Sequence, residues 1–226
     1  MAKNHIVKEG EHISCIAEQN GFAHFRTIWD RPENAALRAQ RNDDPHVLLA
    51  GDVLFIPDRE SKHDTAPTTT TTVFQVDKDV LMLRLRLLDL DNRQLSRETM
   101  CIVKTVRFDF ANRVFPDEKG IIEEEPIPRC LRQAEVLVAR SEFPKVDLKI
   151  GSLDPPDTIS GQRARLNNLG YPAGFSQFES NQFTWAVEEF KCDQKLRPVG
   201  EQDIDFIVKG VRNKVFVDRL RQTHGC

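Results

Sequence analysis

The sequence predicts a multidomain α+β protein, made of a βααβ unit, a small antiparallel β-sandwich and a three-helix bundle. Two interruptions of the apolar pattern divide its 226 residues. The first runs from Asp58 to Thr72 and ends in a row of threonines, and the second, Leu153–Asp157, contains two adjacent prolines. Neither has an apolar period, and a proline pair ends any helix. We therefore expect a linker at 58–72 and domains at 1–57, 73–152 and 157–226.

The first domain is expected to begin and end with a short strand. His5–Gly10 is a strand-like stretch that stops at a glycine. The apolar residues of Ile13–Gly21 recur at i, i+3 and i+4, which is typical of one helical face, and a glycine follows the helix. Asn34–Arg41 is rich in strong helix formers. Gly51–Pro57 is a turn followed by a strand that proline ends.

Both ends of this domain carry a specific motif. It opens Ile6-Val7-x-x-Gly10-Glu11-His12-Ile13-x-x-Ile16-Ala17 and closes Leu49-x-Gly51-Asp52-Val53-Leu54-Phe55-Ile56-Pro57, with Gly21 and Asn34 between. This pattern resembles the LysM domain, which binds N-acetylglucosamine-containing polymers in a shallow groove between two loops. The resemblance implies glycan contacts from Gly10, Glu11, His12, Ile13, Val47, Leu48, Leu49 and Gly51. The alternative is that the glycines only turn the chain and that Ile13 and Leu48 belong to the core.

Residues 73–152 are expected to form short antiparallel strands. Val80–Leu90 alternates over part of its length, with leucines on one face and arginines on the other, as in a half-buried strand. Further strands are expected at Cys101–Val103, Val106–Phe110, Gly120–Ile122, Ala134–Val138 and Lys145–Ile150. Glu123–Glu125 is interpreted as a solvated loop or as an edge that resists strand addition, because no second cluster completes a metal site.

The last domain is expected to be helical. One helix is expected at Ile159–Tyr171, a second at Phe183–Phe190 and a third from Ile204, extending through Leu220. The motif Arg165-Leu166-x-x-Leu169-Gly170-Tyr171-x-x-Gly174, then Ala186-Val187-x-x-Phe190-Lys191, then Leu196-x-Pro198-x-Gly200-x-x-Asp203 resembles the three-helix peptidoglycan-binding domain of cell-wall hydrolases. Its aromatic residues either form a sugar-stacking surface or belong to the core; they are Tyr171, Phe175, Phe178 and Trp185.

The composition excludes several classes of function. Lys and Arg number 32 against 35 Asp and Glu, which argues against binding to nucleic acid. No apolar run approaches the length of a bilayer-spanning helix, so no membrane insertion is expected. The six histidines are scattered without a zinc spacing, and no nucleophile elbow or phosphate loop is present. We therefore expect no enzyme activity, no metal and no cofactor.

The five cysteines are odd in number and lie far apart. This pattern predicts no disulfide framework. Four of them, Cys15, Cys101, Cys130 and Cys192, are expected to be buried thiols in a reducing compartment, with Cys226 a free terminal thiol. The first residues lack the apolar core of a secretory signal. We expect cytoplasmic synthesis, and later export by a signal-independent machine stays open.

Two functional hypotheses follow. Two modules of cell-wall type around a β domain resemble bacterial accessory proteins of contractile injection or type VI secretion spikes. The first hypothesis is a non-catalytic protein that binds peptidoglycan glycan chains through Gly10–Ile13, Leu48 and Tyr171. The second is a structural adaptor whose modules bind a secretion-spike or effector protein.

Overall fold

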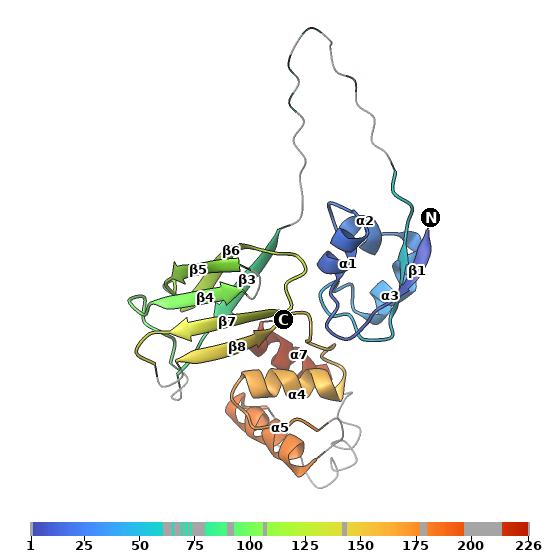
Figure 1. Cartoon of the computed structure of the whole chain (residues 1–226). Coiled ribbons are helices and arrows are strands. Elements are labelled where there is room, and N and C mark those ends of the chain that lie inside the picture. The colour runs from blue at the N-terminus through green and yellow to red at the C-terminus, as the bar shows by residue number, and fades with distance from the viewer. Residues whose placement is uncertain are drawn as a thin grey trace. The chain divides into compact units, whose positions relative to one another are not determined.

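The protein is an α+β chain that forms two compact units, Met1–Ser152 and Leu153–Cys226. The computed structural model describes residues 2–60, 65, 69, 71, 73, 80–89, 93–105, 108–141, 144–176, 180–196 and 214–225. The boundary between the units falls at the proline-containing interruption. The predicted domains 1–57 and 73–152 lie within the same unit. Figure 1 shows the course of the chain.

The first part of unit 1 is a two-stranded sheet with helices on it (Figure 1). The elements, in chain order, are β1 (Lys3–Ile6), α1 (Ile13–Gln19), α2 (Arg26–Trp29), the 3-10 turn η1 (Pro32–Asn34), α3 (Ala35–Gln40) and β2 (Val53–Ile56). β1 and β2 are antiparallel, with Lys3 opposite Ile56. Apolar residues from the helices and from β2 form one core, which includes Ile16, Trp29 and Leu54.

Two buried polar groups fix this part of the fold. Asn34 donates to the carbonyl oxygens of Ile28 and Phe55 and accepts from the Phe55 amide at 2.8 Å. The Arg41 guanidinium binds both carboxylate oxygens of Asp52. Asp52 also accepts from the amide of Leu49. Because buried polar groups cost free energy unless they are paired, these residues tie the helices to the turn before β2 and to the strand itself.

The second part of unit 1 consists of two antiparallel sheets. One pairs β3 (Leu81–Arg86) with β6 (Ile121–Ile127). The other has the order β5-β4-β7-β8, formed by Phe108–Val114, Cys101–Thr105, Gln133–Val138 and Lys145–Lys149. Alternate residues of both sheets meet in one apolar cluster, with Leu83 and Ile122 from the first sheet and Val103 and Val136 from the second.

Of the two interpretations of Glu123–Glu125, the loop is wrong, because β6 continues through these residues to Ile127, while an edge strand is compatible with the two-stranded sheet that β6 forms with β3. Arg84 lies opposite Glu123 in the ladder, and its Nε is 2.9 Å from the Glu123 carboxylate. Paired opposite charges on an exposed strand face are compatible with a ladder. The acidic run therefore does not end the strand.

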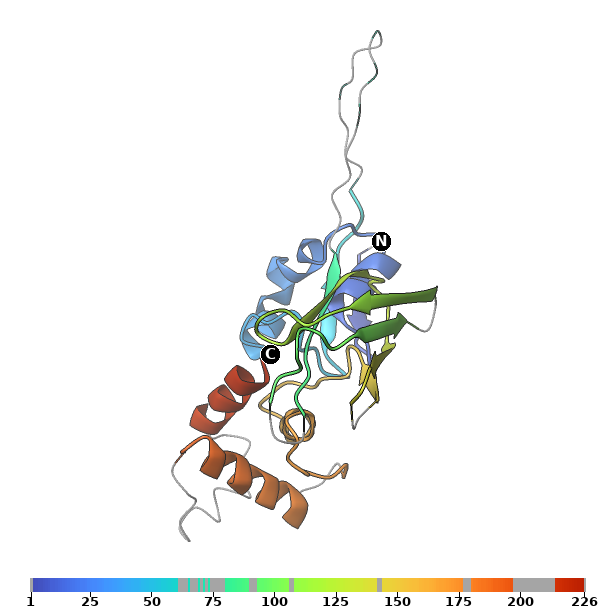
Figure 2. The same cartoon turned by 90° about the vertical axis from the view of Figure 1, so that its left-hand side faces the viewer.

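Unit 2 contains the helices α4 (Ile159–Asn168), α5 (Asn181–Asp193) and α7 (Lys214–His224), which lie together in both views (Figures 1 and 2). Thr158 and Ser180 cap the first two by accepting from the amides of Gly161 and Phe183. Phe190 lies at the centre of the core, which also contains Leu166, Phe183, Phe216 and Leu220. The predicted loop beyond Leu196 and the predicted helix start at Ile204 lie outside the described residues.

Candidate functional site

The loop Gly10–Ile13, for which the LysM resemblance implies sugar contacts, is largely buried within unit 1. The exposed fraction is 8% for Glu11, 7% for His12 and 0% for Ile13, while Gly10 is half-buried. Ile13 packs in the core of the N-terminal part. All three side chains of this loop are therefore turned away from solvent.

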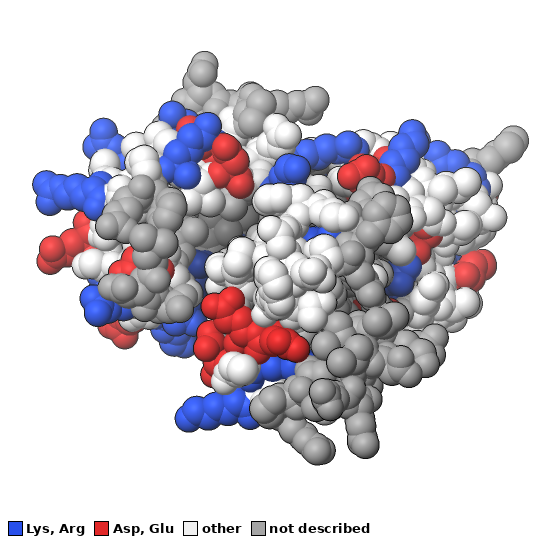
Figure 3. Space-filling view, turned by 90° about the horizontal axis from the view of Figure 1, so that it is seen from below, with Lys and Arg blue, Asp and Glu red and all other residues white. Residues whose placement is uncertain are grey.

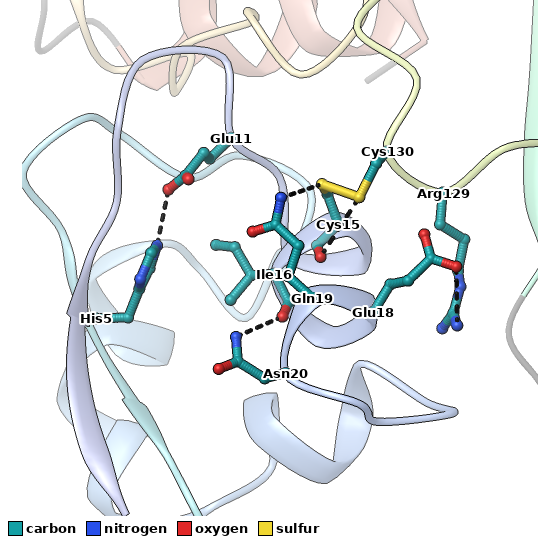
Figure 4. Close-up of a disulfide and its surroundings, with 9 residues drawn as sticks. All are labelled: His5, Glu11, Cys15, Ile16, Glu18, Gln19, Asn20, Arg129 and Cys130. Atoms are coloured by element: carbon teal, nitrogen blue, oxygen red, sulfur yellow. Dashed lines mark hydrogen bonds and ion pairs between the residues drawn. A yellow bond between two sulfur atoms is a disulfide. The ribbon is translucent and has the colours of Figure 1, made fainter. Parts of the chain in front are cut away.

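Glu11 is held by its own neighbours. Its Oε2 lies 2.7 Å from Nε2 of His5 and accepts from the amide of Lys8 at 3.0 Å (Figure 4). Burial alone would raise the pKa of Glu11, but the amide of Lys8 and the imidazole of His5 outweigh it and lower the pKa. The carboxylate is thus charged and already serves to close the turn after β1.

His12 is buried against the second part of unit 1. Burial lowers the pKa of its imidazole, and a hydrogen bond to the backbone of Leu131 offsets this only in part. Among the described residues its Nε2 has no hydrogen-bond partner. The neutral ring therefore lies in a closed environment with one polar atom unsatisfied.

Residues from the end of the β domain cover this loop. A methyl group added at Gly151 would lie 2.8 Å from Cδ2 of His12 and 3.0 Å from the carbonyl oxygen of Gly10. A methyl group at Gly10 would lie 3.6 Å from Oγ of Ser152 and 4.0 Å from Nη1 of Arg132. At these separations little more than a side chain fits between the two backbones. In the closed unit, His12 is therefore not accessible to a sugar ring.

A disulfide and an arginine join the two parts of unit 1 (Figure 4). Cys15, on α1, is bonded to Cys130, which lies between β6 and β7. The neighbouring Arg129 donates to the carbonyl oxygens of Ala23 at 2.8 Å and Phe22 at 3.3 Å. Its Nη2 also lies 3.5 Å from the carboxylate of Glu18 at the end of α1.

The expectation of four buried thiols is wrong for three of the cysteines. Cys15 and Cys130 are bonded, and Cys192 is a free but exposed thiol; only Cys101 is free and buried. Cys226 lies outside the described residues. The sequence pattern missed the bond because the partners stand 115 positions apart and this separation carries no spacing signal. Disulfides persist in oxidising environments, which does not fit the reducing compartment expected from the sequence.

The side chains of the second predicted glycan-contact loop, Val47–Gly51, are mostly buried or half-buried. Val47 and Leu48 are buried, and Leu48 packs in the same core as Ile13. Leu49 is half-buried, and Gly51 is exposed with φ of +97°. That left-handed conformation favours glycine. The structure therefore places Ile13 and Leu48 in the core and Gly51 at a turn, as in the alternative to glycan contacts.

Tyr171 lies in unit 2 against the core. Its ring packs edge-on against Phe190, with 5.5 Å between ring centres. The hydroxyl donates to the carboxylate of Asp193 at 2.9 Å, and burial together with this carboxylate raises the pKa of Tyr171 to about 12. The Tyr171 ring therefore packs against Phe190, and its hydroxyl is paired with Asp193.

Two other aromatic residues of unit 2 are open to solvent. Phe175 is 96% exposed, and Trp185, on α5, is 64% exposed. The exposed Gln182 lies near the backbone at both positions: its Oε1 would lie 2.7 Å from a methyl group at Gly174, next in sequence to Phe175, and it precedes Trp185 by one helical turn. We call Phe175, Gln182 and Trp185 the aromatic surface. Phe178 lies outside the described residues.

We also searched the described residues for a metal site and for a membrane-spanning helix. No group of three His, Cys, Asp or Glu among them is arranged to hold a metal ion. In the same part of the chain, no helix has the length and apolar character needed to cross a membrane. The face shown in Figure 3 carries both basic and acidic side chains, with one group of acidic side chains beside an uncharged area. Comparison with protein-family models, curated proteins and solved structures found no match.

Proposed function

We propose that the chain is a non-catalytic protein that binds peptidoglycan glycan chains through the aromatic surface of unit 2. The observation that carries the proposal is the solvent exposure of Phe175 and Trp185, at 96% and 64%. Large aromatic rings are normally buried, and an exposed pair is typical of a contact surface. The C–H face of a pyranose ring packs well against an aromatic face, as it does in sugar-binding proteins.

The polar part of the aromatic surface suits an N-acetylated sugar. Gln182, which lies close to Gly174 and one helical turn before Trp185, offers an amide donor and an amide acceptor that a hydroxyl or an acetamido group can bind. The proposal also agrees with the resemblance of this unit to the three-helix peptidoglycan-binding domain. In this proposal the first part of unit 1 has the LysM fold and its second part is a β-sandwich.

Co-sedimentation of the purified full chain with insoluble peptidoglycan tests the proposal. We expect Trp185→Ala to reduce the bound fraction at least tenfold, since stacking residues dominate contacts of this kind. Phe115→Ala is the matched control, because Phe115 is an exposed aromatic residue of unit 1, 56% accessible. Equal loss in both variants, or no binding by the parent chain, would contradict the proposal.

A second candidate is an adaptor that binds a secretion-spike or effector protein. It is favoured by the closure of the Gly10–Ile13 loop, which residues of the same chain cover although the LysM resemblance implies glycan contacts there. Co-expression with a candidate spike protein, followed by size-exclusion chromatography without peptidoglycan, tests it. Co-elution that survives Trp185→Ala would support the adaptor and separate it from glycan binding.

A further inference from the structure

The cover over the Gly10–Ile13 loop depends on few contacts. It consists of the segment Arg129–Arg132, between β6 and β7, together with Gly151 and Ser152 at the end of unit 1. Apart from the disulfide, the polar contacts seen among the described residues are those of Arg129 with Phe22, Ala23 and Glu18 and the hydrogen bond between His12 and the backbone of Leu131. Stable interfaces normally have many more hydrogen bonds and a continuous apolar centre.

The closed arrangement also carries a cost at His12. The imidazole is 7% exposed, and its Nε2 has no partner among the described residues. A buried polar atom without a partner disfavours the state that buries it, and water would satisfy it once the cover moved away. Burial also lowers the pKa of His12, which reports the same desolvation. We therefore expect the non-covalent contacts alone to stabilise the closed position of the cover only weakly.

We propose that the disulfide between Cys15 and Cys130 is a redox latch that keeps residues 129–132 and 151–152 closed over the Gly10–Ile13 loop, and that its reduction opens the loop to solvent. The disulfide fixes the cover segment next to α1, which the few non-covalent contacts do not do by themselves. Without it, the N-terminal part stays tethered through residues 61–80, and a tether gives only a modest effective concentration. The proposal does not depend on glycan binding by the aromatic surface.

The reduction is a thiol–disulfide exchange with a dithiol reductant. Cys130 is half-buried and Cys15 is buried, so the attacking thiolate reaches Sγ of Cys130 and Cys15 leaves as a thiolate. The second thiol of the reductant then displaces Cys130. Two electrons and two protons pass to the cysteines, and the reductant becomes a disulfide.

Hydrogen–deuterium exchange of the full chain, with and without dithiothreitol, tests the latch. In the reduced chain we expect amides in peptides covering residues 8–14 to exchange at least tenfold faster, while peptides from β4 and β7 keep their rates. Cys130→Ser should show the fast rates without reductant. Cys192→Ser is the matched control, because Cys192 is exposed and free, and it should behave like the parent chain.

Two results would overturn the proposal. One is an unchanged exchange rate at residues 8–14 in both the reduced chain and Cys130→Ser, which would mean that the other contacts suffice. The other is an oxidised chain whose intact mass does not rise on reduction, which would mean that the bond does not form. Protection of β4 and β7 in every sample separates opening of the loop from unfolding.

Discussion

Asn34 shows how a single side chain can hold a small module together. It is 1% exposed and satisfies three backbone groups of Ile28 and Phe55. Asn34→Ala leaves those groups buried without partners, and each such group costs about 1–3 kcal/mol. We expect a loss of at least about 2 kcal/mol in the free energy of unfolding, measured by urea denaturation.

The control for this prediction is Asn4→Ala, since Asn4 is an exposed residue of β1. An exposed substitution of this kind changes stability by no more than about 0.5 kcal/mol. Similar effects at both positions would show that the Asn34 hydrogen bonds contribute little. The sequence motif includes Asn34, but it does not predict which backbone groups the side chain binds, because those come from α2 and β2.

His224 makes unit 2 sensitive to acid. Burial, with a smaller contribution from the positive charge of Arg165, lowers the pKa of His224 from 6.5 to about 4. The folded state therefore holds this proton less well than the unfolded state, so stability is complete above about pH 6.5 and falls as the pH drops towards 4. We expect His224→Gln to weaken this dependence.

Thermal unfolding followed by circular dichroism at pH 7 and pH 4.5 measures the effect. The parent chain should lose more thermal stability between these values than His224→Gln does. His46→Gln is the control, because His46 is an exposed histidine of unit 1. A parent chain and a His224→Gln variant with the same acid response would contradict the assignment.

At the scale of an element, α4 contains a glycine whose role is packing. Gly161 lies in the first turn, where its amide donates to the cap Thr158 at 3.0 Å. Alanine normally stabilises a helix by about 1 kcal/mol relative to glycine. Here a methyl group would overlap the carbonyl oxygen of Pro155 and lie 2.5 Å from that of Asp154. Backbone at that distance cannot yield as a flexible side chain would.

We therefore expect Gly161→Ala to destabilise unit 2, against its helix propensity. Overpacking of this kind costs about 1–3 kcal/mol, which exceeds the propensity gain. Urea unfolding of the full chain measures the difference, with Ser160→Ala as the exposed neighbouring control. A stabilised Gly161→Ala variant would show that the segment before α4 can move away.

The strands illustrate what local patterns can and cannot predict. The alternation of leucine and arginine predicts β3, and the ladder confirms it over Leu81–Arg86. For the acidic run after Ile122 the sequence left a loop and an edge strand open, because composition alone does not reveal a cross-strand partner. Arg84 supplies that partner from a strand far earlier in the chain. Pairing across a sheet is a tertiary property, and no local window contains it.

At the scale of the whole molecule, the sequence predicts the pieces better than their docking. The interruption at Leu153–Asp157 coincides with the boundary between the two units. The earlier interruption, Asp58–Thr72, falls within unit 1, because the disulfide and Arg129 join its two sides. For the candidate sites, the sequence pattern does not predict exposure, because the same pattern includes Tyr171, which is partly buried against the core, and Trp185, which is exposed.

The covalent link between the two parts of unit 1 allows a direct test on the whole chain. A specific protease site in place of residues 66–72 would cut the chain between β2 and β3, leaving Cys15 on one fragment and Cys130 on the other. If the bond forms, the cut chain migrates as one 25.9 kDa species without reductant and as two fragments with it. The same cut in Cys130→Ser should give two fragments in both conditions. Two fragments from the parent sequence without reductant would mean that the cysteines are not joined. In that case unit 1 would also lack a cross-link worth about 5 kcal/mol in chain entropy for a loop of this length.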